Sequence, residues 1–159
     1  MKRVPYHPTP PEKARELLEL AGLQRGELLL DLGCGEGNLL VSAARDFGAR
    51  AVGIEIDEKL VEVARRRVAE LGLTDVEVIQ GDIFSPRFWS HLGGEGFTVA
   101  QADVVAIYLN FEAHRELKPL LERELREGTR VASYEFFVYG WKPVREKPMM
   151  FVFRKGESF

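Results

Sequence analysis

The chain has 159 residues, of which 45% are hydrophobic and 30% charged, and its formal net charge is −3. This composition is typical of one soluble globular domain, residues 1–159, and the charge gives no reason to expect general affinity for nucleic acid or an anionic membrane. The one cysteine, Cys34, excludes an internal disulfide and fits a reducing compartment. No apolar run reaches the roughly 20 residues that span a bilayer, and the N-terminus lacks the apolar core of a signal peptide. We therefore expect a cytoplasmic protein without a membrane partner, with a monomer favoured.

The amide side chains are scarce. Asn and Gln total five residues, whereas Arg and Glu are abundant. This bias is typical of proteins from thermophiles, although GC-rich coding would produce it as well.

The first predicted helix begins after a proline-rich segment, residues 5–8, which should be extended because the residue before a proline avoids helical geometry. Thr9 can cap this helix, the following prolines fit its first turn, and Glu12 completes a capping box. Apolar residues at positions 14, 17, 18 and 21 then fall on one face, and Gly22 ends the helix.

Strands and helices alternate along the rest of the chain. The hydrophobic pattern predicts strands at 27–32, 50–56, 75–80, 102–108 and 130–137, and one or two more within 140–153. Helices are expected from about 38 to 47, from 57 to 72 with Leu71 inward, from 85 to 92, and from 110 to 127 with a kink or restart at Pro119. Residues 93–96 read as a flexible loop. The fold class is therefore α/β, a three-layer sandwich whose mostly parallel sheet ends in an antiparallel C-terminal hairpin.

The loop after the first strand has an unusual glycine pattern. The strand stops at Asp31, and glycines follow at positions 33, 35 and 37. A dinucleotide-binding loop needs a third glycine where Asn38 stands, so that fingerprint is absent. A carboxylate at this strand tip would repel a pyrophosphate but suits a ligand that carries an ammonium group. Close backbone approach and an ammonium ligand are therefore expected here.

Further carboxylates follow the next two strands. Glu55 ends the second strand and can accept hydrogen bonds from both hydroxyls of a ribose. Asp82 follows the third strand and can accept from an adenine amino group, while Ile56 and Ile83 enclose the base. Ligands of open α/β sheets bind beyond the carboxyl ends of the strands, so we expect the three carboxylates to line one crevice.

Together these motifs resemble the class I S-adenosylmethionine (SAM) methyltransferases. The resemblance rests on Asp31–Gly37, on Gly53–Asp57 and on Gly81–Phe84. It implies a Rossmann-like seven-stranded sheet whose last strand is antiparallel, although the region after the fifth strand is short for the family's usual next helix. It also implies SAM as cofactor, with Asp31 and the loop residues Gly33, Cys34, Gly35 and Asn38 around its methionine end.

A narrower resemblance is to the small archaeal protein-lysine methyltransferases and the related mitochondrial enzymes of the same non-SET fold. It rests on the segment from Pro5 to Pro10, on Tyr108-Leu109, and on residues 128–133 followed by an aromatic strand. It implies that residues 1–22 cover the cofactor site, with Tyr6 and Thr9 at the methionine end, and that Tyr108 is catalytic. His7 receives no role.

A protein lysine is therefore the expected methyl acceptor, with broad specificity. Aromatic faces can guide an ammonium by cation–π contact, and Tyr108 is the first candidate. Phe111, Phe136, Tyr139 and Trp141 are others, with packing preferred for Phe111 and Phe136. Methylation of RNA or a small molecule, and a non-catalytic SAM-binding module, remain the alternatives.

Other chemistries lack their motifs. The three histidines have no zinc-ligand spacing, and neither a nucleophile elbow nor a Walker lysine is present, so no metal is expected. Residues 108–111 differ from the Asn-Pro-Pro-Tyr type motif of enzymes that methylate bases or glutamine. The triplet 65–67 of arginines could contact RNA, but a solvated helix face is the preferred interpretation, and nucleic acid is not the expected partner.

Overall fold

The computed structural model describes residues 4–91 and 96–159. The expectations for Leu92 and for residues 93–95 lie outside this part of the chain. The helices are α1 (Pro11–Leu20), α2 (Asn38–Phe47), α3 (Glu58–Glu70), α4 (Pro86–His91) and α5 (Phe111–Glu124), with a short 3-10 helix, η2, at Val99–Gln101. The strands are β1 (Leu28–Leu32), β2 (Arg50–Glu55), β3 (Val76–Gln80), β4 (Val104–Ile107), β5 (Arg130–Tyr134), β6 (Arg145–Lys147) and β7 (Met150–Arg154).

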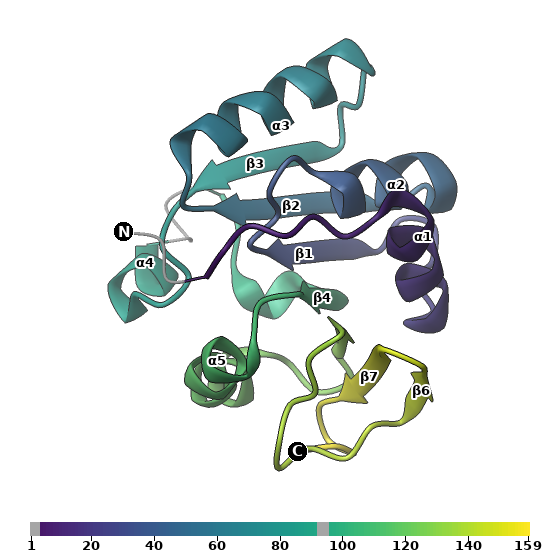
Figure 1. Cartoon of the computed structure of the whole chain (residues 1–159), viewed down its shortest axis with the longest axis vertical. Helices are drawn as coiled ribbons and strands as arrows, with labels where there is room; N and C mark the ends of the chain where they lie inside the picture. Colours follow the sequence, from purple (N-terminus) through teal and green to yellow (C-terminus); the bar gives the residue numbers. More distant parts are fainter. Residues whose placement is uncertain (1–3, 92–95) are drawn as a thin grey trace.

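All seven strands form one sheet in the order β3-β2-β1-β4-β5-β7-β6 (Figure 1). The first five strands in this order are parallel, and β7 pairs antiparallel with both β5 and β6. The predicted fold class and the antiparallel C-terminal hairpin are confirmed. The strand order reverses between β1 and β4, which is the place where such sheets bind ligands.

Helices cover both faces of the sheet. Alternate residues of β1 divide between two cores: Leu29 faces the helices α1, α2 and α3, whereas Leu28, Leu30 and Leu32 face α4 and α5. Burying β1 on both faces explains its apolar sequence, which only Asp31 interrupts. The three layers hold the carboxyl end of β1 rigidly at the centre of the sheet.

Two predictions about helix ends are wrong. The first helix begins at Pro11, so its cap position falls on Pro10, and Thr9 lies one residue too early to cap it; no side chain caps this end. Leu71 is 41% exposed. It is the residue after the last helical position of α3, so helical periodicity no longer directs it inward. The α5 helix continues through Pro119 as one element rather than restarting there.

The fifth strand is three residues shorter than predicted. It ends at Tyr134, because Glu135 adopts a left-handed backbone conformation with φ of 69°. Residues 135–144 then lead to β6 without a helix, in agreement with the short length noted in the sequence.

None of the helices in residues 4–91 and 96–159 combines the length and the apolar character that a membrane span requires.

Candidate active site

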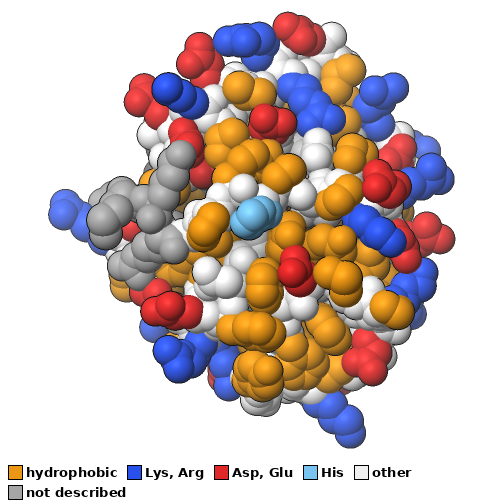
Figure 2. Space-filling model, viewed as in Figure 1, with side chains coloured by type: hydrophobic (Ala, Val, Ile, Leu, Met, Phe, Trp, Pro, Cys, Tyr) orange, Lys and Arg blue, Asp and Glu red, His pale blue; other side chains and the backbone are white. Residues whose placement is uncertain are grey.

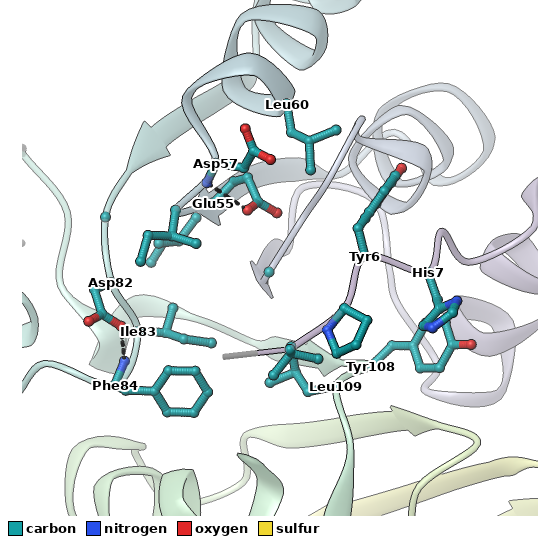
Figure 3. Close-up of a pocket in the computed structure, with 16 residues that line it drawn as sticks. Tyr6, His7, Glu55, Asp57, Leu60, Asp82, Ile83, Phe84, Tyr108 and Leu109 are labelled. Atoms are coloured by element: carbon teal, nitrogen blue, oxygen red, sulfur yellow. Dashed lines mark hydrogen bonds between the residues drawn. The ribbon is translucent and has the colours of Figure 1, made fainter. Parts of the chain in front are cut away.

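Two adjoining pockets lie at the carboxyl ends of the central strands (Figure 3). The larger spans about 670 Å³ and the smaller about 330 Å³, each counted with the open solvent at its mouth. Tyr6, His7, Gly33 and Tyr108 line both. A ligand that fills both pockets must therefore pass these four residues.

The larger pocket holds the side chains predicted for the nucleoside end. Glu55, Ile56, Asp82 and Ile83 all line it. Figure 3 shows Glu55 on the side formed by β2 and Asp82 on the side formed by the loop after β3. The prediction that carboxylates of successive strands come together is therefore correct for these two.

Glu55 is buried, and backbone groups hold its carboxylate in place. The Gly35 N–H donates to Oε1 and the Asp57 N–H to Oε2, each at 2.9 Å. A carboxylate has about four acceptor positions, so two remain for a ligand. Asp82 is held in a similar way, because its Oδ1 accepts the Phe84 N–H at 2.9 Å. Both carboxylates are thus oriented before any ligand arrives.

Asp31 lines the smaller pocket and is only 3% exposed. Burial, with a smaller contribution from the nearby Glu55, raises the pKa of its carboxyl group to about 8. Within residues 4–91 and 96–159, no hydrogen bond to this carboxylate compensates its burial. The site is therefore preset for a cationic ligand group, which would stabilise the ionised form.

The glycine loop lets the N-terminal segment approach closely. Gly35 has a φ of 54°, and a Cβ placed on it would lie 2.4 Å from the ring of Tyr6. In Figure 1 the N-terminal segment crosses in front of β1 and β2, and in Figure 3 Tyr6 and His7 reach the pockets from it. The ring of Tyr6 thus lies against the glycine loop. His7, to which no role was assigned, lines both pockets.

Asn38 joins three parts of the chain. Its Nδ2 donates to the Thr9 carbonyl oxygen at 2.8 Å, and its Oδ1 accepts from Arg67 at 2.6 Å. Thr9 is itself buried beside the smaller pocket. Arg65 donates twice to the Val78 carbonyl oxygen. Two arginines of the triplet therefore form hydrogen bonds within the protein.

Cys34 is buried, and burial raises the pKa of its thiol well above the usual value. Its Sγ lies 2.6 Å from the position that a Cβ on Gly53 would take. The residue packs the loop against β2 while lining the smaller pocket.

Tyr108 stands at the tip of β4, between the two pockets and a group of exposed aromatic rings. Its ring stacks on Phe136 with centroids 6.1 Å apart, and Phe136 contacts Phe111 edge to face at 5.1 Å. Phe111 is 46% and Tyr139 70% exposed. We call Tyr108, Phe111, Phe136 and Tyr139 the aromatic rim.

The exposed rim changes two sequence-based interpretations. Phe111, for which packing was preferred, contacts the rings of Phe136 at 5.1 Å and Tyr139 at 5.5 Å, but nearly half of its surface is open. Trp141, in contrast, is 3% exposed and stacks on Phe159 at 3.8 Å, so it packs the hairpin. On the face of the molecule that Figure 2 shows, hydrophobic side chains gather over the middle and lower part, and most Lys and Arg lie near the periphery.

Sequence reasoning missed Glu135. The Tyr108 hydroxyl donates to its Oε2 at 2.8 Å. Burial and this carboxylate raise the pKa of Tyr108 to about 12, so the hydroxyl keeps its proton at neutral pH. No signal in the sequence marked Glu135, because it stood inside an apparently continuous aromatic strand.

Comparisons with known proteins show which family the chain matches. The sequence profile of the ANTKMT methyltransferase domain matches residues 31–145. A protein-lysine N-methyltransferase of Saccharolobus islandicus is 36% identical over 142 residues, which cover 88% of this chain and 81% of that protein.

Solved structures of similar proteins share the fold. An RNA methyltransferase from Salinibacter ruber, in complex with S-adenosyl-L-homocysteine, is 37% identical with a TM-score of 0.80, and the match covers 94% of this chain and 92% of that one. TrmN from Thermus thermophilus has a TM-score of 0.70 at 21% identity, over 91% of this chain and 48% of that one. The family profile covers most of the chain and includes the glycine loop, both pocket carboxylates and Tyr108, so the chain belongs to the ANTKMT methyltransferase domain family.

Proposed function

We propose that this protein transfers methyl groups from SAM to lysine side chains of proteins. The observation that carries the proposal is the similarity, over nearly the whole of both chains, to a protein-lysine N-methyltransferase. The exposed aromatic rim beside the pockets supports it, because aromatic faces attract an ammonium and its methylated product. Broad specificity follows from a rim that lies open on the surface.

The residues of the two pockets fit SAM. The buried Asp31 carboxylate suits the ammonium of its methionine end, and the loop backbone at Gly33 and Gly35 lies beside the same pocket. Glu55 would accept from the ribose hydroxyls, and Asp82 from the adenine amino group, with Ile56 and Ile83 against the base. When bound, SAM supplies an electrophilic methyl group.

The protein's own contribution is placement and exclusion of water. Tyr6 and His7 cover the place where the two pockets meet, and Tyr108 borders it from the side of the aromatic rim. The acceptor lysine has to react as the neutral amine. An apolar surrounding favours this form, because it lowers the pKa of the ammonium group. We propose Tyr108 as the residue that touches the acceptor amine.

The direct test is transfer of labelled methyl groups. The purified protein is incubated with methyl-labelled SAM and with separated protein and RNA fractions of a cell lysate, which are then hydrolysed. We expect label in methylated lysine. Label in methylated nucleosides without any in lysine would refute the proposal, and tight SAM binding with no transfer to either fraction would favour a non-catalytic module.

RNA is the second candidate acceptor, since the similar protein from Salinibacter ruber is described as an RNA methyltransferase. Charge argues against it here. RNA binding depends on basic surfaces that contact phosphates, whereas this chain has a net charge of −3 and uses Arg65 and Arg67 for internal hydrogen bonds. Lysine is therefore the preferred acceptor.

A substitution at Gly35 tests whether the N-terminal segment completes the SAM site. Gly35→Ala adds a methyl group 2.4 Å from the nearest ring atom of Tyr6, which is too close for contact, so the ring should be displaced. We expect SAM affinity, measured by calorimetry, to fall by about 10- to 100-fold, the equivalent of about 1.4–3 kcal/mol.

Gly72→Ala is the matched control, because Gly72 also has a positive φ, 66°, but has open space around it. Both variants should lose about 1 kcal/mol of folding stability through backbone strain. Equal SAM affinity in the two variants would show that Tyr6 does not contribute to the site.

We also propose that residues 1–159 work as a single domain, as a monomer in the cytoplasm of a thermophile. Gel filtration with light scattering tests the first two points. A dimer at micromolar concentration would contradict the monomer.

A further inference from the structure

Glu135 adopts a backbone conformation that residues other than glycine rarely take. Its φ is 69°, and the Phe136 N–H donates to the Tyr134 carbonyl oxygen at 2.8 Å across it, which closes a three-residue turn. Such turns with a positive φ are strained, and a residue other than glycine adopts them only where the surroundings impose it. The strain therefore needs a cause in the neighbouring structure.

Two hydrogen bonds hold this turn. The Glu135 N–H donates to the Met149 carbonyl oxygen at 2.6 Å, and the Ser133 hydroxyl donates to the Phe136 carbonyl oxygen. The buried His114 lies beside the turn: its ring contacts Phe136 edge to face at 6.1 Å, and its Nε2 accepts the Leu109 N–H at 3.2 Å. His114 thus links the tip of β4 to the segment after β5, and its burial lowers the pKa of its imidazole to about 4, which keeps it neutral.

The result of the turn is the position of one carboxylate. It directs the exposed Glu135 side chain to the Tyr108 hydroxyl, which donates to it at 2.8 Å. A continued β-strand would alternate side chains between the faces of the sheet, and the turn breaks this alternation at position 135. Within the described ranges, no Lys or Arg forms an ion pair with Glu135.

The hydrogen bond also decides what Tyr108 can do. A phenol hydroxyl can donate one hydrogen bond, and that of Tyr108 is donated to Glu135. The phenol oxygen can therefore act toward any other partner only as an acceptor. Tyr108 lines both pockets. The ring itself is fixed between Tyr134, edge to face at 4.9 Å, and Phe136.

We propose that Glu135 is a positioning residue that commits the Tyr108 hydroxyl to accept a hydrogen bond from the acceptor amine. This inference rests on the proposed lysine methylation. The neutral amine gives one N–H to the phenol oxygen, which orients its lone pair toward the junction of the pockets. As the amine lone pair forms the new bond to the methyl carbon, the bond from this carbon to the sulfonium sulfur would break and its electron pair would stay on sulfur. The methylated nitrogen then carries a positive charge and releases one proton to solvent at the exposed rim.

The test compares kinetic constants of variants with a synthetic peptide that carries one lysine. Glu135→Gly should lower kcat by about 10-fold or more and leave KM and the SAM dissociation constant within about 2-fold of wild type. Glu135→Gln should retain most of the activity, because its amide oxygen can still accept the tyrosine proton. In a Tyr108→Phe background, Glu135→Gly should change kcat by less than about 2-fold, since the two residues act as a unit.

Three outcomes would overturn the inference. They are an unchanged kcat in Glu135→Gly, equal losses in Glu135→Gln and Glu135→Gly, and losses that multiply in the double variant. Wild-type protein that labels RNA instead of lysine would refute the proposed function, which the direct transfer experiment detects separately.

A readout independent of turnover is the ionisation of Tyr108, followed by ultraviolet absorbance. Loss of the carboxylate in Glu135→Gly should lower the pKa of Tyr108, and the signal is assigned by its absence in Tyr108→Phe. An unchanged tyrosine pKa would contradict the inference.

Met149→Gly controls for relief of strain, because Met149 is the other described non-glycine residue with a positive φ, 65°. Both glycine variants should unfold at the same or a higher temperature than wild type.

Discussion

Replacing Asp31 by asparagine is expected to make the ligand-free protein more stable at alkaline pH while it weakens SAM binding. The folded-state pKa of about 8 lies well above the usual 3.8 for this carboxyl group. The folded state therefore holds a proton that the unfolded state has lost between these two values, and the stability of the wild type falls as pH rises through that window. Asparagine has no charge to bury, so it removes this dependence.

The predicted difference grows with pH. At about 1.4 kcal/mol per pKa unit, the Asp31→Asn variant should be about 1–2 kcal/mol more stable than wild type at pH 5 and roughly 6 kcal/mol more stable at pH 9, where the whole difference between 3.8 and about 8 counts. Urea unfolding at several pH values measures it. Parallel curves for the two proteins across this range would show that Asp31 is not a buried, destabilising carboxylate.

SAM binding should move in the opposite direction. Losing a charged partner for the ammonium is expected to weaken binding by about 1.5–3 kcal/mol. In the wild type at pH 7, binding should also release close to one proton from Asp31, seen as a dependence of the calorimetric enthalpy on the buffer. The Asn variant should show no such release, and unchanged affinity would place the ammonium elsewhere.

Replacing Glu55 by alanine should damage both the cofactor site and the fold. The change removes the acceptor for the ribose hydroxyls, and it removes the carboxylate that accepts from the N–H groups of Gly35 and Asp57. We expect SAM affinity to fall by about 1–3 kcal/mol, and folding stability by about 2–4 kcal/mol, because hydrogen bonds to a buried charged group contribute more than neutral ones. Calorimetry and urea unfolding separate the two effects.

Glu58→Ala is the control for charge, since Glu58 is exposed at the start of α3. It should change neither quantity by more than about 0.5 kcal/mol. Wild-type affinity in Glu55→Ala would refute the placement of the ribose.

The sequence was most informative where one element determined the position of the next. Alternation of strands and helices forces parallel pairing, and parallel pairing brings the residues after the strands to one edge. Glu55 and Asp82 could therefore be placed in one pocket without coordinates. Asn38 excluded a dinucleotide-binding loop, because it stands where that motif needs a glycine. Its hydrogen bonds to Thr9 and Arg67, however, join segments far apart in the sequence, and no local pattern encodes such contacts.

The features that could not be predicted depend on contacts that override local preference. The aromatic residues after Tyr134 favour a strand, yet bonds from Met149 and Ser133 bend the chain at Glu135. The start of α1 illustrates a smaller limit. From the sequence, either Thr9 or Pro10 could stand at the N-cap position of this helix. The structure shows that Pro11 is the first helical residue, so Pro10 occupies the N-cap.

The reversal of strand order at β1 and β4 has a consequence for how new acceptors can evolve. Of the described residues that line the two pockets, all but Tyr108 and Leu109 precede residue 85, whereas the aromatic rim comes from residues 108–139. Recombination between relatives at a point between these halves would exchange the acceptor side and keep the methyl-donor side intact. Arg130 is the tie that such hybrids must preserve, because it bonds Glu27 at 2.6 Å and the carbonyl oxygens of Ala21 and Gly22.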